Sequence, residues 1–160
     1  MGVHGGFLGF LEGARRLRRL KELPKVGQYA TAALDASVWL HQLAVGVDAV
    51  AAMKGDYEAV ITAFIRRLYK LLFFNMLVFV VFDGAENPAK LQEDAKRASS
   101  RAAARQRFAS LCGEVEPDPN ELEKLARAAF SRSPELQEQL QERLTSEGFR
   151  WMVAPCEADN

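Results

Sequence analysis

Residues 76–84 read MLVFVVFDG, and this stretch decides the fold. Its unbroken apolar run is rich in β-branched and aromatic residues, which predicts a strand from Met76 to Phe82. Continuous apolarity is typical of a strand that is covered on both faces, as in a parallel sheet. Asp83 follows directly, so its carboxylate is expected at the point where the strand ends.

Two more strands are expected, one on each side of this stretch. Tyr29 to Leu34 is a short apolar run that ends in Asp35. Phe149 to Val153 is the other, and it leads into Glu157 and Asp159. Because helical patterns separate the strands, the order predicts an α/β fold with a parallel sheet and right-handed crossovers.

Helices are expected wherever apolar residues recur at helical spacing. This spacing predicts four of them, over Phe7 to Leu20, Trp39 to Met53, Tyr57 to Phe74 and Lys90 to about Cys112. The apolar face of the third consists of Val60, Ile61, Phe64, Leu68, Leu71 and Leu72. Asn120 and Glu123 have the spacing of a capping box that begins a fifth helix. Ser133-Pro134 begins a last helix, which we expect to end at Gly148.

Acidic residues follow all three expected strands. A single aspartate there is usually a cap or a turn residue, but here Asp35, Asp83, Glu157 and Asp159 would share the edge where parallel sheets bind ligands. Gathered carboxylates repel one another unless cations neutralise them. Oxygen ligands without a His or Cys cluster suit Mg²⁺ or Mn²⁺ rather than zinc. The pattern therefore indicates phosphodiester hydrolysis, in which two ions about 4 Å apart activate water and stabilise the leaving oxygen.

A basic stripe follows Asp83 along the chain. Lys90, Arg97, Arg101 and Arg105 are seven, four and four positions apart, which places them on one face of a helix. Such a stripe beside a carboxylate-metal site could hold a phosphate. It could equally be a solvated helix face, because Glu93 and Asp94 dilute the charge. Spacing alone leaves both interpretations open.

Composition excludes several other classes of protein. The 160 residues suit one domain, and 21 basic residues balance 21 acidic ones, so net charge does not indicate a nucleic-acid partner. Cys112 and Cys156 are far apart and read as reduced thiols. The apolar stretch from Leu68 to Phe82 is shorter than the about 20 residues of a membrane span. A phosphate-binding glycine loop and a Gly-x-Ser-x-Gly turn are both missing from the sequence.

Four motifs, in order along the chain, resemble the flap endonuclease superfamily of 5′ nucleases, which includes exonuclease 1 and the xeroderma pigmentosum G nuclease. They are Met1-Gly2-Val3-His4-Gly5, Leu34-Asp35-Ala36-Ser37, Val81-Phe82-Asp83-Gly84 and Val153-Ala154-Pro155-Cys156-Glu157-Ala158-Asp159. Trp39-Leu40-His41 and Ala129-Phe130-Ser131-Arg132-Ser133 look more like exonuclease 1 than flap endonuclease. The resemblance implies a PIN-like parallel-sheet domain, flanked by helices and carrying a helical arch.

The resemblance also implies roles for individual residues. Two Mg²⁺ ions, for which Mn²⁺ could substitute, would be held directly or through water by Asp35, Asp83, Glu157 and Asp159. Lys90 and Arg97 match the basic residues that contact the scissile phosphate. DNA contacts are implied for Gly2, close to the active site, and for His41, which would pack on a substrate base. Arg101 and Arg105 extend the basic stripe and are candidates for DNA binding as well.

The family's organisation divides the chain into residues 1–110 as the N-terminal nuclease region, 111–147 as an arch or cap segment and 148–160 as the start of the internal nuclease region. An arch through which a 5′ end passes would reach back to Asn87. Family members continue into another strand with two more aspartates and a helix-two-turn-helix that grips duplex DNA. Because the chain ends at Asn160, we expect a form truncated at its C-terminus, with an incomplete sheet and metal site.

The substrate implied by the resemblance is DNA with a 5′ end, a flap or a nick, in repair or replication. It further implies a nuclear location, no membrane partner, and mismatch-repair or replication proteins as partners of the full-length protein. Two alternatives stay open, namely a catalytically inactive DNA-binding remnant of the family and a PIN-like ribonuclease. The arch segment and the start of the chain argue against the ribonuclease.

Overall fold

The computed structural model describes residues 29–84 and 91–155 of the chain. The helix expected over Phe7 to Leu20 lies outside this part. Along the described chain the elements alternate between strands and helices, as the sequence pattern predicts. The fold is α/β.

Three parallel strands form the sheet, with β2 (Met76–Phe82) between β1 (Ala30–Asp35) and β3 (Arg150–Val153). Ala30 pairs with Met76 at one end of the β1–β2 ladder, and Asp35 pairs with Val81 at the other. Phe79 pairs with Arg150 at the start of β3. The parallel arrangement confirms the prediction and brings the carboxyl ends of all three strands to one edge.

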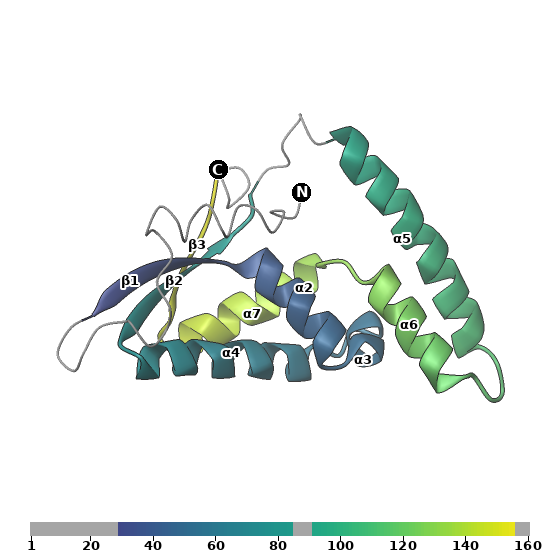
Figure 1. Ribbon diagram of the computed structural model, residues 1–160, viewed down its shortest axis with the longest axis horizontal. Helices are drawn as coiled ribbons and strands as arrows, with labels where there is room; N and C mark the ends of the chain where they lie inside the picture. The colour runs from purple at the N-terminus through teal and green to yellow at the C-terminus, as the bar shows by residue number, and fades with distance from the viewer. Residues whose placement is uncertain (1–28, 85–90, 156–160) are drawn as a thin grey trace, which may run out of the picture.

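Three helices pack on one face of the sheet (Figure 1). They are α2 (Ala36–Gly46), α4 (Glu58–Phe73) and α7 (Pro134–Ser146). Val80 and Phe82 of β2 are fully buried against this layer, whereas Leu77 on the opposite face is 47% exposed. The apolar run of β2 predicted cover on both faces, but the described helices supply it on one face only.

The main core lies between the sheet and these helices. Val60, Ile61, Phe64 and Leu68 of α4 are buried there, as expected from the helical pattern. Ile65 is also buried, whereas Leu72 is 41% exposed, so the expected apolar face is wrong at its end. Leu72 is on the same face as Leu68, four residues earlier, but it stands in the last turn of α4, so its exposure goes with the end of the helix. The remaining buried members are Ala36, Leu40, Leu43, Ala44, Ala52, Val80, Phe82, Phe130, Leu136, Leu140 and Leu144.

The helix expected from Trp39 to Met53 is in fact two helices. The first, α2, begins earlier because Asp35 caps it, and it ends at Gly46. The second, α3 (Ala49–Met53), begins after Asp48, whose Oδ1 accepts a hydrogen bond from the backbone N–H of Ala51 at 2.8 Å. This capping bond stabilises a new helix start and so favours the break.

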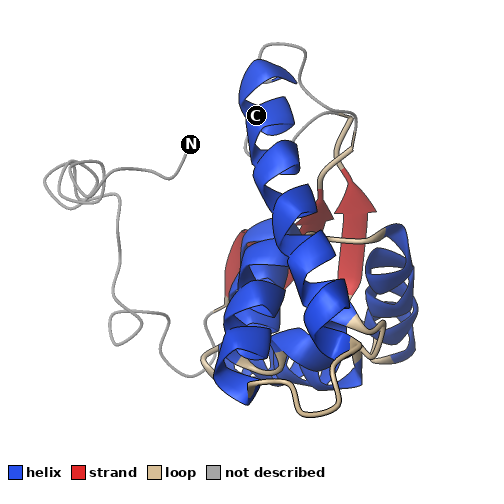
Figure 2. Cartoon of the chain, turned by 90° about the vertical axis from the view of Figure 1, so that its right-hand side faces the viewer, coloured by secondary structure: helices blue, strands red, loops and turns tan. Residues whose placement is uncertain are grey.

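A pair of helices, α5 (Leu91–Cys112) and α6 (Pro119–Ala129), stands beside this body and faces the viewer in Figure 2. Phe108 of α5, Ala126 of α6 and Ala49 of α3 form a second small core that docks the pair. Asp118 caps α6, so the capping box expected at Asn120 is wrong. Proline is favoured at the first helical position, and Pro119 therefore sets the start two residues earlier.

The expected start of the last helix is confirmed at Ser133-Pro134. The Ser133 hydroxyl accepts a hydrogen bond from the backbone N–H of Leu136 at 3.1 Å and lies 3.0 Å from the Tyr57 hydroxyl. The helix ends at Ser146, and Gly148 follows with φ of 77°, a conformation that costs glycine little. No helix within the described ranges is long and apolar enough to span a membrane.

Candidate functional site

The carboxylate of Asp35 stands where β1 turns into α2. Its Oδ1 accepts hydrogen bonds from the backbone N–H groups of Ser37, at 2.7 Å, and Val38, at 3.3 Å. These are amides of the first turn of α2, which otherwise have no partner within the helix. The cap fixes the direction of the carboxylate at the carboxyl edge of the sheet, and the helix dipole favours its negative charge.

Asp83 follows β2 at the same edge and contacts two side chains. The Ser37 hydroxyl donates a hydrogen bond to Asp83 Oδ2. Nη1 of Arg132 lies 3.1 Å from the same Oδ2 and 2.5 Å from the Ser37 hydroxyl oxygen. Ser37 therefore touches both Asp35, through its backbone, and Asp83, through its side chain. Asp35 and Asp83, two of the four carboxylates proposed as metal ligands, therefore both contact Ser37.

The chain after β3 also reaches this place. The backbone N–H of Ala154 donates to the Phe82 carbonyl at 2.9 Å. A side chain at Gly84 would overlap the Ala154 carbonyl oxygen and would lie 3.2 Å from the carbonyl carbon of Pro155. The glycine is thus required by close approach, and it lets the segment that leads to Glu157 pass directly beside Asp83.

Four of the proposed site residues fall outside the described part of the chain, namely Gly2, Lys90, Glu157 and Asp159. Within the described ranges, no group of three or more His, Cys, Asp or Glu side chains could hold a metal ion. Asp35 and Asp83 are the proposed ligands that the structure does place. Their carboxylate oxygens are of the kind that Mg²⁺ and Mn²⁺ prefer, so the donor chemistry fits the proposed ions.

The basic residues of α5 line a groove against α2 and α6. Its volume is about 400 Å³, and its walls are His41, Arg97, Ser100, Arg101, Arg127, Ala128 and Phe130. His41 is exposed, and its ring meets the buried Phe130 ring edge-on, at 6.2 Å between centroids. Arg97, Arg101 and Arg105 lie four positions apart within α5, and Arg105 donates a hydrogen bond to the Ser131 hydroxyl. The groove offers cationic and aromatic surface to a polyanion.

A short segment joins the groove to the carboxylates. Phe130 packs on His41, Ser131 accepts from Arg105, and Arg132 reaches Asp83. We call residues 130–133, between α6 and α7, the α6–α7 linker. Its successive side chains contact the groove, helix α5 and the carboxylate site in turn.

Sequence reasoning missed three residues of this site as functional candidates. Ser37 and Arg132 were noted only within motifs, and Arg127 was not singled out. Ser37 stands two positions after Asp35, so a search for hydroxyls beside the acidic strand ends could have found it. Arg132 lies 49 positions from Asp83, and only the course of the α6–α7 linker brings them together.

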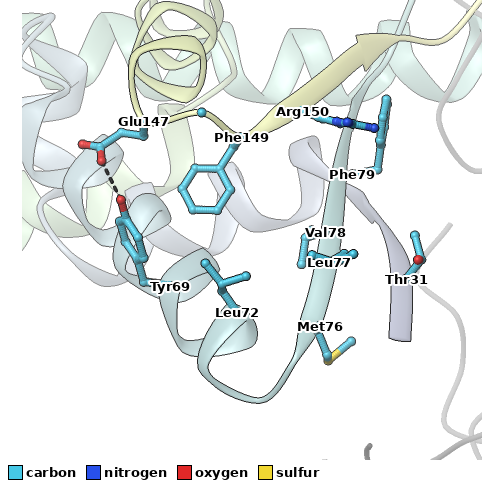
Figure 3. Close-up of a pocket in the computed structure, with 11 residues that line it drawn as sticks. Thr31, Tyr69, Leu72, Met76, Leu77, Val78, Phe79, Glu147, Phe149 and Arg150 are labelled. Carbon is cyan, nitrogen blue, oxygen red and sulfur yellow. Dashed lines mark hydrogen bonds between the residues drawn. The ribbon is translucent and has the colours of Figure 1, made fainter. Parts of the chain in front are cut away.

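A cavity of about 380 Å³ lies at the opposite end of the sheet, where β2 and β3 begin (Figure 3). Tyr69, Leu72, Met76, Leu77 and Phe149 are among the residues that line it. The Tyr69 hydroxyl donates to Glu147 Oε2 at 2.8 Å, and this bond, with some desolvation and the charge of Glu147, raises the pKa of Tyr69. The carboxylate site is not part of this cavity.

Comparison with known proteins shows which family this chain resembles in sequence. The XPG N-terminal domain family matches residues 1–104. Flap endonuclease 1 of Drosophila grimshawi is 32% identical over 133 residues, which cover 79% of this chain and 33% of the relative. Exodeoxyribonuclease 1 of Saccharomyces cerevisiae is 30% identical over 132 residues, which cover 80% of this chain and 18% of the relative. The chain spans a third or less of the length of these curated relatives.

Solved structures show the same fold. The catalytic core of Rad2 in complex with DNA substrate superposes with a TM-score of 0.59 at 25% identity, covering 99% of this chain and 39% of that one. A second complex of the same core gives a TM-score of 0.55 at 26% identity, covering 99% and 38%. These neighbours support the PIN-like fold. With the family match over residues 1–104, they show that the chain belongs to the flap endonuclease/XPG family, through its N-terminal domain.

Proposed function

We propose that this chain supplies the N-terminal half-site of a structure-specific 5′ nuclease that hydrolyses DNA phosphodiester bonds with Mg²⁺. The observation that carries the proposal is the convergence of Asp35 and Asp83 on Ser37, at the carboxyl edge of a parallel sheet. Membership in the family supports nuclease chemistry at this edge. The exonuclease and flap endonuclease relatives support the same chemistry.

The metal centre would be built from carboxylates at the ends of three strands. Asp35 and Asp83 are proposed ligands, with Glu157 and Asp159 joining them from the segment after β3. Bound Mg²⁺ would supply an activated water and stabilise the leaving oxygen. The chain's own part is to hold the carboxylates, since the α2 cap orients Asp35 and the Ser37 hydroxyl orients Asp83.

The proposed substrate is DNA near a 5′ end, a flap or a nick. The Rad2 structures contain DNA substrate, and the arginine-lined groove between α2, α5 and α6 is the surface that we propose for DNA in this chain. We propose that Arg101 contacts backbone phosphates and that the exposed His41 ring, which packs on the buried Phe130, presents aromatic surface to a base. Lys90 and Arg97 are proposed to hold the scissile phosphate. A DNA-directed role in the nucleus follows from this substrate and disfavours the ribonuclease alternative.

Cleavage of a labelled 5′ flap and of a recessed 5′ duplex tests the proposal, with Mg²⁺ or with EDTA. In a protein that joins this half-site to the remaining metal ligands, we expect cutting that requires Mg²⁺ and that Asp83→Ala abolishes, with little change in DNA affinity because the carboxylate does not attract phosphate. Arg143→Gln is the matched control, since Arg143 pairs with Glu58 on the helical layer. Cutting that persists in EDTA or in Asp83→Ala would refute the metal centre. DNA binding without any cutting by this chain alone fits the half-site, whereas the same result for the completed protein would favour the DNA-binding remnant.

Arg97→Ala separates a role in chemistry from a role in binding. If Arg97 contacts the reacting phosphate, its loss lowers the rate of cleavage of bound DNA by orders of magnitude and DNA affinity only slightly. If it positions the duplex, affinity and rate fall together. Lys90→Ala should behave in the same way as Arg97→Ala.

A further inference from the structure

Arg132 occupies the candidate metal centre as a cation of the chain itself. Its Nη1 atom lies 3.1 Å from Asp83 Oδ2, and the two side chains are 30% and 24% exposed. At this depth the pair is screened less than a surface ion pair. The Ser37 hydroxyl bonds to both groups, so the guanidinium is held by hydrogen bonds as well as by charge.

The backbone on both sides of Arg132 is anchored. Phe130, 4% exposed, belongs to the main core, and Ser133 caps α7 while contacting Tyr57. These contacts aim the arginine side chain at the edge of the sheet. The packing of the α6–α7 linker therefore places the Arg132 guanidinium next to Asp83. A surface arginine without such anchored neighbours would not be held in this way.

A divalent cation and this guanidinium would compete for the same oxygen. Mg²⁺ binds carboxylate oxygens at about 2.1 Å, so an ion on Asp83 Oδ2 would stand within a few ångströms of Arg132 Nη1. Two cations so close repel each other strongly in a partly buried site. Ser37 is neutral and can stay bonded to Asp83 in either state.

We propose that Arg132 is the internal counter-ion of the metal-free site, and that a divalent metal displaces it from Asp83 on binding. The inference rests on the proposed metal centre and adds to it a residue that sets metal affinity. Arg132 neutralises Asp83 while the metal is away. Each metal-binding event must break the ion pair, so the arginine weakens metal affinity.

Mn²⁺ binding to the full chain, measured by calorimetry or by loss of the free-ion electron paramagnetic resonance signal, tests the proposal. We expect Arg132→Gln to tighten Mn²⁺ binding by about 3- to 10-fold, the factor that corresponds to losing one partly screened ion pair. The Arg132→Lys variant keeps the positive charge beside Asp83, so its affinity for Mn²⁺ should be lower than that of the Arg132→Gln variant. Arg143→Gln makes the same change of charge away from the site, and its affinity should stay within about twofold of the unmodified chain.

A second measurement does not depend on affinity. Without metal, Arg132→Gln should unfold at a lower temperature than the unmodified chain, because the ion pair between Arg132 and Asp83 is lost. Saturating Mn²⁺ should shrink this difference, since the metal then neutralises Asp83 in both proteins. The test compares the gap in unfolding temperature between the variant and the unmodified chain, first without metal and then in saturating Mn²⁺. It therefore works even if the metal-free variant is only marginally stable.

The outcomes separate this inference from the proposed function. If Asp83→Asn weakens Mn²⁺ binding but Arg132→Gln leaves it unchanged or weaker, the arginine is a permanent part of the site and the inference is overturned. If Asp83→Asn binds Mn²⁺ as tightly as the unmodified chain, the metal centre itself is misplaced. A difference in unfolding temperature that persists in saturating Mn²⁺ would also contradict displacement.

Discussion

Asp35 Oδ1 lies 2.7 Å from the backbone nitrogen of Ser37, so one carboxylate both begins α2 and faces the candidate metal centre. Structural and chemical roles can be separated here by choice of substitution. Asparagine caps helices about as well as aspartate, whereas alanine cannot cap at all. The pair Asp35→Asn and Asp35→Ala therefore distinguishes loss of charge from loss of the helix cap.

We expect Asp35→Ala to lower the free energy of unfolding by about 1 kcal/mol, the usual contribution of an N-cap. Asp35→Asn should stay close to the unmodified chain in stability while losing affinity for Mn²⁺. Urea denaturation and Mn²⁺ titration of both variants check this. Equal Mn²⁺ affinity in Asp35→Asn and the unmodified chain would remove Asp35 from the metal centre.

Gly84→Ala should be strongly destabilising. The new Cβ would overlap the Ala154 carbonyl oxygen, and because the obstacle is backbone, the strand exits would have to separate. Overpacking of this kind costs about 1–3 kcal/mol. Gly46→Ala is the matched control, since a Cβ there meets nothing within 4 Å and alanine favours the end of α2. Thermal unfolding should show a loss for the first variant and none for the second.

The groove makes a prediction about salt dependence. If Arg101 and Arg127 each neutralise a phosphate, replacing either by glutamine should weaken binding of flap DNA and reduce the slope of log affinity against log salt by about one. Fluorescence anisotropy over a range of salt concentrations measures both effects, with Arg143→Gln as the control. A weaker affinity with an unchanged slope would mean that the arginine supports the fold of the groove and does not contact phosphate.

Tyr69 provides a prediction about pH. Its pKa is raised mainly by the hydrogen bond to Glu147, so Glu147→Ala should lower it toward the ordinary value, while Glu142→Ala should not. The neutral phenol is favoured in the folded protein. Its contribution to stability is therefore complete below about pH 10 and is lost as the pH rises through the raised folded pKa. Phenolate absorbance, taken as the difference from a Tyr69→Phe protein, measures the shift.

The sequence predicted elements best where local composition decides structure. Met76–Phe82 is a strand as expected, because its β-branched and aromatic residues favour extended backbone. The break between α2 and α3 escaped prediction because apolar residues continue at helical spacing through Val47. Asp118 and Asn120 are both good caps, and the position of Pro119 decided between them.

The same distinction holds at the site. Acids at strand ends are readable from sequence, because a parallel sheet necessarily gathers them at one edge. The contact between Arg132 and Asp83 could not be predicted from the sequence, since it depends on the course of the α6–α7 linker. The hydrogen bond from Arg105 to Ser131 was likewise not predicted, because it joins residues 26 positions apart.

The α6–α7 linker connects helix α5 to the carboxylate of Asp83 over two adjacent residues. Arg105 of α5 holds Ser131, and the next residue holds Asp83. Ser131 and Arg132 are adjacent, so a displacement of α5 that is passed on through the Arg105–Ser131 contact would act on the Arg132–Asp83 contact one residue away. Helix α5 and the carboxylate at the end of β2 are thus coupled through a single peptide bond of the linker.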